Sequence, residues 1–85
     1  MEEHINSFID YLRIERNYSK NTVESYLTDI SDFKNFILNT NGKLPVLDDI
    51  DYLIIRSYLA DLQGKQLARS TILRKLSSLR SFFKY

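Results

Sequence analysis

The sequence predicts an all-α domain, and three observations support that prediction. Apolar residues recur at spacings of three and four along four separate segments. No segment shows the alternation of apolar and polar residues that is typical of a half-buried strand. Residues that commonly cap helices stand directly before two of the four segments. We therefore expect a small bundle of four helices.

The first predicted helix covers about residues 2–16 and the second about residues 19–39. Ser19 should cap the second helix, because its side-chain oxygen can accept a hydrogen bond from an amide of the first turn. In both helices the apolar residues fall on one face. They are Ile5, Phe8, Ile9 and Leu12 in the first helix, and Val23, Tyr26, Leu27, Ile30, Phe33 and Ile37 in the second.

The third predicted helix covers about residues 52–63 and the fourth about residues 69–84. Asp51 should cap the third helix at its start, and Gly64 should cap it at its end. One long loop is expected over residues 39–51, where asparagine, glycine and proline gather. The apolar faces consist of Ile55, Leu59 and Leu62 in the third helix and of Ile72, Leu76, Leu79 and Phe83 in the fourth, with Leu73 and Phe82 on the flanks.

The fourth predicted helix lacks a capping side chain, because Ala68 stands where Ser or Asp is common. Its first N–H groups therefore lack their usual acceptor, although the hydroxyl groups of Ser70 and Thr71 can accept some of these hydrogen bonds. A phosphate oxygen would be stabilised at such a positively polarised helix start. Water would satisfy the same groups, and the sequence leaves both possibilities open.

The composition limits the class of protein. A chain of 85 residues with 44% hydrophobic content fits one small domain, expected over residues 1–85, and leaves little room for an enzyme with a lid and a buried cleft. Cysteine is absent and His4 is the only histidine, so neither disulfides nor a structural metal site are expected. No apolar run approaches the roughly 20 residues of a membrane span, and the N-terminus is acidic. We expect a cytoplasmic protein with no cofactor, no metal and no membrane contact.

Positive charge is concentrated at the carboxyl end. The whole chain carries a net charge of +1. Residues 62–85 contain six basic residues and no acidic one, whereas residues 1–61 contain six basic and eleven acidic residues. Helical periodicity places these carboxyl-terminal charges on a defined face. The asymmetry predicts a polyanionic partner.

The predicted outer face of the fourth helix combines hydroxyl groups with cations. Short hydroxyl side chains allow a helix to approach a duplex closely, and longer cations reach phosphates or guanine edges in the major groove. An ordinary solvated face is the alternative, but such faces usually mix charges of both signs. The pattern therefore favours nucleic-acid binding. The face consists of Ser70, Thr71, Arg74, Lys75, Ser78 and Ser81.

A second candidate surface lies at the start of the second helix. Lys20 can contact a phosphate, and Asn21 or Ser25 can reach a base edge or a sugar. With Thr22, these residues are also compatible with an ordinary helix start. Glu24, Asp32 and Asn35 follow on the outer face, so only the first turn is expected to meet DNA.

Arg80 is predicted to have a structural role. It falls near the apolar face of the fourth helix, so it should be partly buried and should need a carboxylate partner. Asp29, at the edge of the apolar face of the second helix, is the best-placed acid. We therefore expect an Asp29–Arg80 ion pair rather than a DNA contact by Arg80. Tyr85 is expected to be an aromatic residue at the edge of the core or in a linker rather than a nucleophile.

Three blocks of sequence stand in a characteristic order. They run over Phe8–Phe33, which includes Ser19-Lys20-Asn21-Thr22, over Tyr58–Leu62, and over Thr71–Phe83. Together they resemble the N-terminal core-binding domain of tyrosine recombinases of the XerC/XerD and phage-integrase group, and the resemblance covers nearly the whole chain. It implies a four-helix SAM-like bundle that forms half of a C-shaped clamp around DNA, with the second and fourth helices facing the major groove. It also implies that the strand-cleaving tyrosine lies in a separate C-terminal domain, absent here, so the chain by itself should be non-catalytic.

The resemblance assigns DNA contacts by position. At the position of Ala68 the family often has Ser, and at the position of Ser70 it often has a basic residue. In this chain the basic residue, Arg69, stands one position earlier. Arg69 and Ser70 complete the predicted interface. The contact residues implied for the second helix are Lys20, Asn21, Thr22 and Ser25, and those for the fourth are Thr71, Arg74, Lys75 and Ser78.

The predicted function is that of a DNA-binding domain of a site-specific recombinase or integrase. It would bind half of a recombination site in double-stranded DNA and support the assembly of recombinase subunits for strand exchange. Alone it should bind weakly, with a dissociation constant of roughly 10⁻⁴ to 10⁻⁶ M. The alternative is a helical protein-interaction module that docks an acidic partner, with Ile14 and Ile54 in its contact patch.

Overall fold

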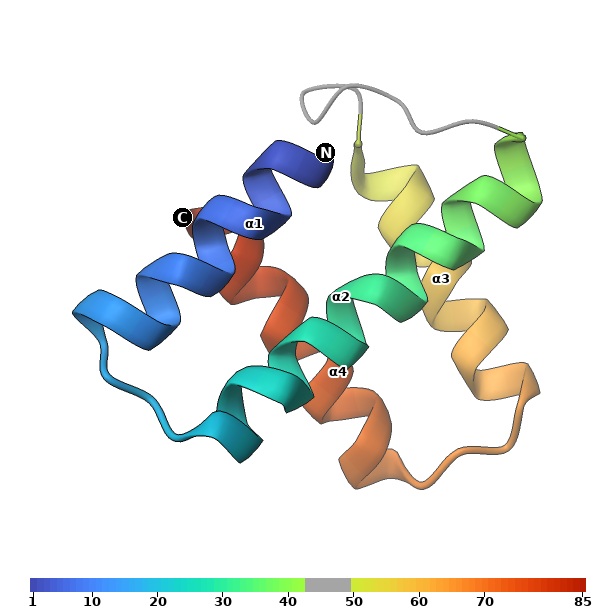
Figure 1. Cartoon of the computed structure of the whole chain (residues 1–85). Helices are drawn as coiled ribbons and strands as arrows, with labels where there is room; N and C mark the ends of the chain where they lie inside the picture. Colours follow the sequence, from blue (N-terminus) through green and yellow to red (C-terminus); the bar gives the residue numbers. More distant parts are fainter. Residues whose placement is uncertain (43–49) are drawn as a thin grey trace.

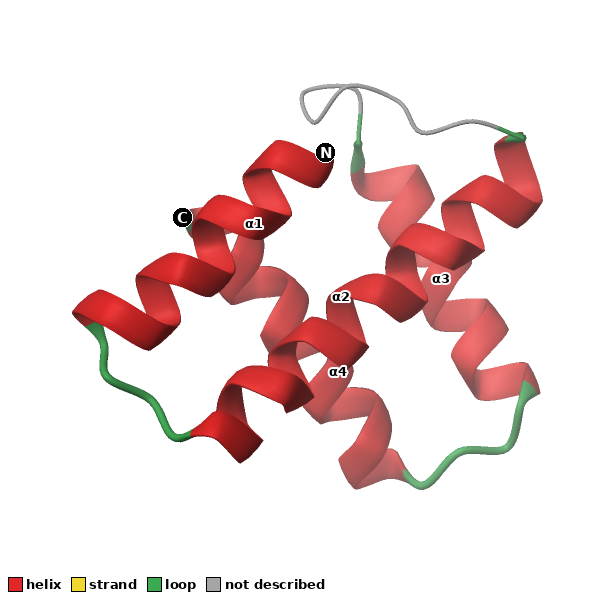
Figure 2. Cartoon of the chain, viewed as in Figure 1, coloured by secondary structure: helices red, strands yellow, loops and turns green. Residues whose placement is uncertain are grey.

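The computed structural model describes residues 1–42 and 50–85 of the chain. These residues fold into four α-helices and one short π-helical turn, with no strand among them (Figure 2). The predicted all-α architecture of four helices is therefore confirmed. The elements are α1 (Glu2–Asp10), the π-helical turn η1 (Tyr11–Glu15), α2 (Lys20–Asn41), α3 (Tyr52–Gly64) and α4 (Arg69–Lys84).

The helix starts follow the capping chemistry that the sequence predicts. The Oγ atom of Ser19 accepts a hydrogen bond from the amide of Thr22 at 3.2 Å. At the start of α3, Oδ1 of Asp51 accepts one from the amide of Ile54 at 3.1 Å. Ala68 precedes α4 and supplies no side-chain cap. All three predicted starts are confirmed, because each depends only on residues within one turn.

The helix ends agree less closely with the prediction. Gly42 ends α2 in the left-handed conformation with φ of 78°, and its amide donates to the carbonyl of Leu38 at 2.9 Å. The predicted cap at Gly64 is wrong, because Gly64 is still helical and the left-handed residue is Gln66, with φ of 57°. Of the predicted long loop, residues 43–49 lie outside the described residues.

The core lies along α2, which runs diagonally across the molecule between α1 and α3 and crosses in front of α4 (Figure 1). Buried side chains form two clusters, one toward each end of α2. Their burial holds the four helices together, because each helix contributes apolar residues to at least one cluster. The first cluster contains Ile5, Phe8, Leu12, Val23, Ile30 and Phe82. The second contains Phe33, Ile37, Tyr58, Leu62 and Leu79.

The carboxyl end of α4 packs against α1. The ring of Tyr85 lies with its centroid 5.0 Å from that of Tyr11 and 5.4 Å from that of Phe8. Its hydroxyl donates to the carbonyl of Ser7 at 3.2 Å. The predicted place of Tyr85 at the edge of the core is therefore confirmed. None of the described helices combines the length and the apolar character needed to cross a bilayer.

The crossing of α2 and α4 places their first turns on the same side of the molecule. Both helices begin along the lower edge of Figure 1. Asp29 on α2 is hydrogen-bonded to Ser78 on α4, which fixes the two helices against each other near the crossing. The two surfaces that the sequence predicts for DNA contact are thus neighbours in space.

Candidate nucleic-acid interface

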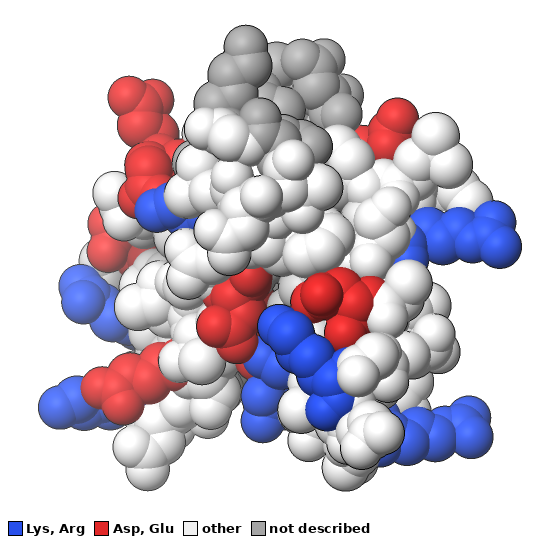
Figure 3. All heavy atoms as spheres, turned by 90° about the vertical axis from the view of Figure 1, so that its right-hand side faces the viewer, with Lys and Arg blue, Asp and Glu red and all other residues white. Residues whose placement is uncertain are grey.

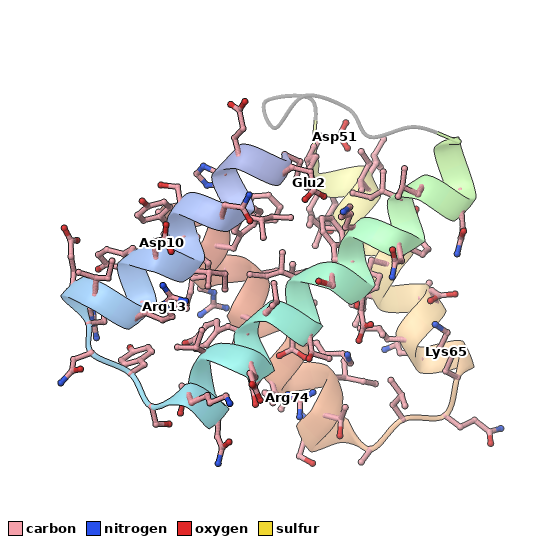
Figure 4. All side chains as sticks on the ribbon, viewed as in Figure 1. Glu2, Asp10, Arg13, Asp51, Lys65 and Arg74 are labelled. Atoms are coloured by element: carbon pink, nitrogen blue, oxygen red, sulfur yellow. The ribbon has the colours of Figure 1, made fainter. Side chains whose placement is uncertain are left out.

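A groove of about 620 Å³ lies between the first turns of α2 and the first half of α4. Hydroxyl groups from both helices line it, and Arg74 lies between the two helices (Figure 4). The structure therefore brings together residues that are about 50 positions apart in the sequence. The lining residues are Thr22, Ser25, Tyr26, Asp29, Ser70, Leu73, Arg74, Ser77 and Ser78.

The first turn of α2 is held in place by Ser19. Its Oγ atom donates to Oγ1 of Thr22 at 2.9 Å and accepts the amide hydrogen bond of the same residue. Lys20, Asn21 and Ser25 are exposed beside this turn. The cap therefore fixes the backbone while these polar side chains stay free to contact another molecule.

A neighbouring hollow of about 360 Å³ extends the groove along α2. Arg74 also lines it, opposite Asn21 and Glu24. Glu24 is exposed and places a carboxylate at this edge. A carboxylate there repels phosphate groups, but it can accept a hydrogen bond from the N4 amino group of cytosine.

Asp29 is the centre of a polar cluster between α2 and α4. Its side chain has no exposed surface. Oδ1 lies 2.9 Å from Nη2 of Arg74 and 3.5 Å from Nζ of Lys75, and Oδ2 accepts a 2.7 Å hydrogen bond from Ser78. Nζ of Lys75 also lies 2.6 Å from Oδ2 of Asp32. Two acidic and two basic side chains thus balance one another, as buried charges require.

The cluster changes the role of two predicted contact residues. Lys75 has a relative exposure of 7% and Ser78 is also buried, so the prediction that both face outward is wrong. Asp29 supplies a hydrogen-bond partner for both of these polar side chains on the inner side of α4. Lys75 therefore lies outside the groove, whereas Ser78 lines it with its hydroxyl already donated to Asp29.

The predicted ion pair between Asp29 and Arg80 is also wrong. Arg80 is exposed and pairs with no carboxylate of the described residues. Arg80 faces solvent, and the Asp29 oxygens are occupied by Arg74, Lys75 and Ser78. The polar residues on the inner face of α4 therefore determine which basic side chain pairs with the buried Asp29.

Other predicted residues lie at the start of α4. Arg69 and Ser70 are exposed, and Thr71 is half-buried. Since Ala68 supplies no cap, the first amides of α4 remain without a side-chain acceptor. These exposed groups adjoin the groove through Ser70.

Leu73 is a lining residue that the sequence did not reveal. Periodicity placed it on the flank of the apolar face, yet 54% of its surface is exposed and it lines the groove. Ser70 precedes it by three positions and Ser77 follows it by four, so all three share one face. That pair of serines is the local signal that could have identified Leu73 as an outward residue.

A second hollow, of about 460 Å³, lies between α2, α3 and α4 and holds paired charges. The ammonium of Lys65 is 3.2 Å from the carboxylate of Asp61, and the Lys75–Asp32 pair lies in the same hollow. Figure 3 shows basic and acidic atoms interleaved on this face. This face is therefore a poorer site for a polyanion than the groove.

Tyr58 lines the second hollow with a hydroxyl that has no hydrogen-bond partner. Burial first, and then the negative charges of Asp32, Asp29 and Asp61, together raise the pKa of Tyr58 to about 12. The phenol consequently remains protonated at neutral pH. Among residues 1–42 and 50–85, no three acidic or histidine side chains gather as a metal site requires.

The alternative contact patch is only half exposed. Ile14 has 72% of its surface exposed. Ile54 instead packs against the second core cluster, because its side of α3 faces α2. The two residues also lie on different elements, η1 and α3. Of the two residues of the predicted patch, Ile14 alone is exposed.

Comparison with known proteins identifies the family. The model of the family described as "Phage integrase, N-terminal SAM-like domain" matches residues 5–85. The tyrosine recombinase XerC of Lacticaseibacillus casei is 46% identical over 81 residues, which cover 95% of this chain and 27% of the relative. XerC of Bacillus licheniformis is 44% identical over 78 residues, which cover 92% of this chain and 25% of the relative.

A third relative, the tyrosine recombinase XerC of Pelotomaculum thermopropionicum, is 42% identical over 88 residues, covering all of this chain and 29% of the relative. The chain therefore spans about a quarter of the length of these curated relatives. No solved structure matches it. By its helical fold, the family match and these identities, the chain belongs to the N-terminal SAM-like domains of the phage-integrase family of tyrosine recombinases.

Proposed function

We propose that this chain binds double-stranded DNA through the first turn of α2 and the outer face of α4. The observation that carries the proposal is the groove, where hydroxyl groups of both helices converge around Arg74. Among the described residues that line it, Asp29 is the one acid, and its charge is compensated by the polar cluster. Hydroxyl groups and a guanidinium suit phosphate oxygens and the edges of bases.

Three cations border this surface and give the proposal a measurable electrostatic signature. Lys20 and Arg69 are exposed, and the Arg74 side chain is half-exposed. Three phosphate contacts predict that log K falls with log salt with a slope of about −3. The affinity of the chain alone should then lie in the nonspecific range, with a dissociation constant of roughly 10⁻⁴ to 10⁻⁶ M.

The proposed biological role is a non-catalytic part of a site-specific recombinase in the cytoplasm. The chain would bind half of a recombination site and support the assembly of recombinase subunits. Strand cleavage would be carried out by another part of the protein, in line with the curated relatives, of which this chain matches only about a quarter. Residues 1–85 would act as one domain in that assembly.

Titration of a fluorescently labelled duplex at about 50 and about 200 mM salt tests the binding proposal. The wild-type chain should lose roughly 40-fold in affinity between the two conditions. Arg74→Glu should bind more weakly at both. Arg56→Glu is the matched control, because Arg56 is exposed on α3 and lies outside the groove. Salt-independent binding, or no binding at low salt, would count decisively against the proposal.

A second candidate function is protein interaction, for which Ile14 is the exposed member of the predicted contact patch. An isoleucine with 72% of its surface exposed is available to contact another protein. This role would be supported if the nuclease-treated protein self-associates in sedimentation experiments and the Ile14→Ser variant is monomeric. If the wild type and the Ile14→Ser variant are both monomeric, this contact is excluded for the isolated chain.

A further inference from the structure

We propose that Leu73 contacts the 5-methyl group of thymine in the major groove and gives the chain a preference for A·T pairs at that position. This inference deepens the proposed function and rests on it. It assigns a role in sequence preference to a residue that neither the charge pattern nor the hydroxyl pattern selected.

The first support is the position of Leu73. Single exposed apolar residues are common, so exposure alone decides nothing. Leu73, however, lies in the wall of the groove, beside the guanidinium-bearing Arg74 and across from Thr22 and Ser25 of α2. A duplex that contacts the hydroxyl groups of both helices must therefore also cover Leu73.

The second support is the size of its neighbours. Ser70 and Ser77 share the face of Leu73, and both have short side chains. A helix with serines on either side can approach the base edges closely, and the longer leucine then extends farthest between them. Leu73 is consequently better placed than its neighbours to touch a base.

The third support is chemical complementarity. Guanine, cytosine and adenine present hydrogen-bonding groups to the major groove, and thymine also presents a methyl group. Leu73 has no polar atom in its side chain, so covering a polar base edge would remove water without supplying a hydrogen bond. Covering the thymine methyl instead buries two apolar surfaces together, which corresponds to a gain in affinity of about three- to fourfold.

The test compares an alternating A·T duplex with the same duplex in which uracil replaces every thymine. The two differ only in the 5-methyl group, and thymine at every second position removes the need to know the target sequence. The wild-type chain should bind the thymine duplex about three- to fourfold more tightly. Leu73→Ala should bind both duplexes equally, and Leu73→Ile should keep the preference.

Two further measurements complete the test. Replacing cytosine by 5-methylcytosine in an alternating G·C duplex places a methyl group at the same edge of the major groove, so wild-type affinity should rise and that of Leu73→Ala should not. Thermal melting of each variant checks the fold, which should persist because Leu73 is half-exposed. All titrations use low salt, where the chain binds most strongly.

The outcomes separate this inference from the proposed function. Equal wild-type affinity for the thymine and uracil duplexes overturns the role of Leu73, while a salt-dependent affinity that needs Arg74 would leave the proposed function standing. A preference for thymine that survives in Leu73→Ala also overturns the inference, because another residue must then contact the methyl group. Failure to bind any of the duplexes at low salt overturns both.

Discussion

Arg74 and Asp29 form an ion pair whose two members differ completely in exposure. Nη2 of Arg74 lies 2.9 Å from Oδ1 of Asp29, yet the Arg74 side chain is 54% exposed and the Asp29 side chain is fully buried. Asp29 also has Lys75 and Ser78 as partners. Arg74 can therefore exchange Asp29 for a phosphate while the buried carboxylate remains compensated.

Replacing Arg74 by Ala should weaken DNA binding with little effect on the fold. The loss of one phosphate contact should lower the salt slope by about 1 unit. The free energy of unfolding should fall by no more than about 1 kcal/mol, because the pair is partly exposed and Asp29 keeps its other partners. Salt-dependent duplex titrations and thermal denaturation measure the two effects.

Arg74→Lys is the matched control for this variant, since it keeps the positive charge and loses the planar guanidinium. It should retain the salt slope and lose only part of the affinity. An Arg74→Ala protein that binds DNA like the wild type would show that Arg74 makes no DNA contact, and one that no longer folds would show that Arg74 is needed for the fold.

Replacing Lys75 by Glu should destabilise the fold strongly. The variant places a third carboxylate beside Asp29 and Asp32, in a position where the lysine is 7% exposed. The loss in unfolding free energy should be about 3 kcal/mol or more, as is typical of breaking a buried charge pair. Circular dichroism melts should show a clear decrease in melting temperature.

Comparison with Arg74→Glu sharpens this prediction, because both variants reverse one positive charge on neighbouring residues. Arg74→Glu should melt closer to the wild type than Lys75→Glu. Equal melting temperatures for the two variants would contradict the assignment of Lys75 to the interior and of Arg74 to the surface.

The helices and their starts were predictable because their causes are local. Apolar spacing places α2 and α4, and the caps at Ser19 and Asp51 depend on neighbours within one turn. The orientation of α4 was not predictable in the same way. It depends on Asp29, which lies 45 positions before Arg74, and no local pattern shows which side of the helix a distant carboxylate will meet.

The candidate interface was predictable only in part for the same reason. The first turn of α2 and the residues Ser70 and Arg74 lie where periodicity placed them, beside one groove. Lys75 has the same charge as Arg74 and follows it directly, but a polar cluster holds it inside. Charge and hydroxyl content predicted this region as a candidate, and packing determines which of its side chains are exposed.

Replacing Tyr58 by Phe should make the protein more resistant to alkaline unfolding. The pKa of Tyr58 is raised from about 10 to about 12 in the folded state, so the unfolded chain loses this proton first as the pH rises. The stability that depends on Tyr58 is therefore present below pH 10 and is lost between about pH 10 and 12. Phenylalanine has no proton to lose.

Melting temperatures of wild type and Tyr58→Phe across this pH range measure the effect. At neutral pH the variant should be as stable as the wild type, because the hydroxyl that it lacks has no partner. Tyr52→Phe, at an exposed tyrosine on the same helix, is the control and should lose stability as the wild type does. Identical alkaline melts for wild type and Tyr58→Phe would refute the prediction.

Replacing Ala68 by Ser should stabilise α4 at its start. Ala68 has extended backbone angles, φ of −59° and ψ of 145°, and supplies no side-chain acceptor. A serine at this position can cap the helix, which should add about 1 kcal/mol to the free energy of unfolding. Chemical denaturation measures the gain, and an unchanged midpoint would show that the first amides are already satisfied.

The same variant distinguishes the two possible occupants of the uncapped helix start. If a DNA phosphate binds the free amides, the new hydroxyl competes with it and DNA affinity falls. If water occupies them, DNA affinity stays at the wild-type value. Ala60→Ser is the control, because it adds a hydroxyl at an exposed position of α3 that lies outside the groove.

Mapping amide chemical-shift changes on the isotope-labelled chain during titration with a DNA duplex at low salt tests the central claim most directly. Binding in the groove between α2 and α4 predicts that the largest changes fall in residues 19–25 and 69–77. Changes centred on Ile14 or on Tyr52 and Leu53, with the groove residues unaffected, would contradict the assignment of the groove as the DNA-binding surface.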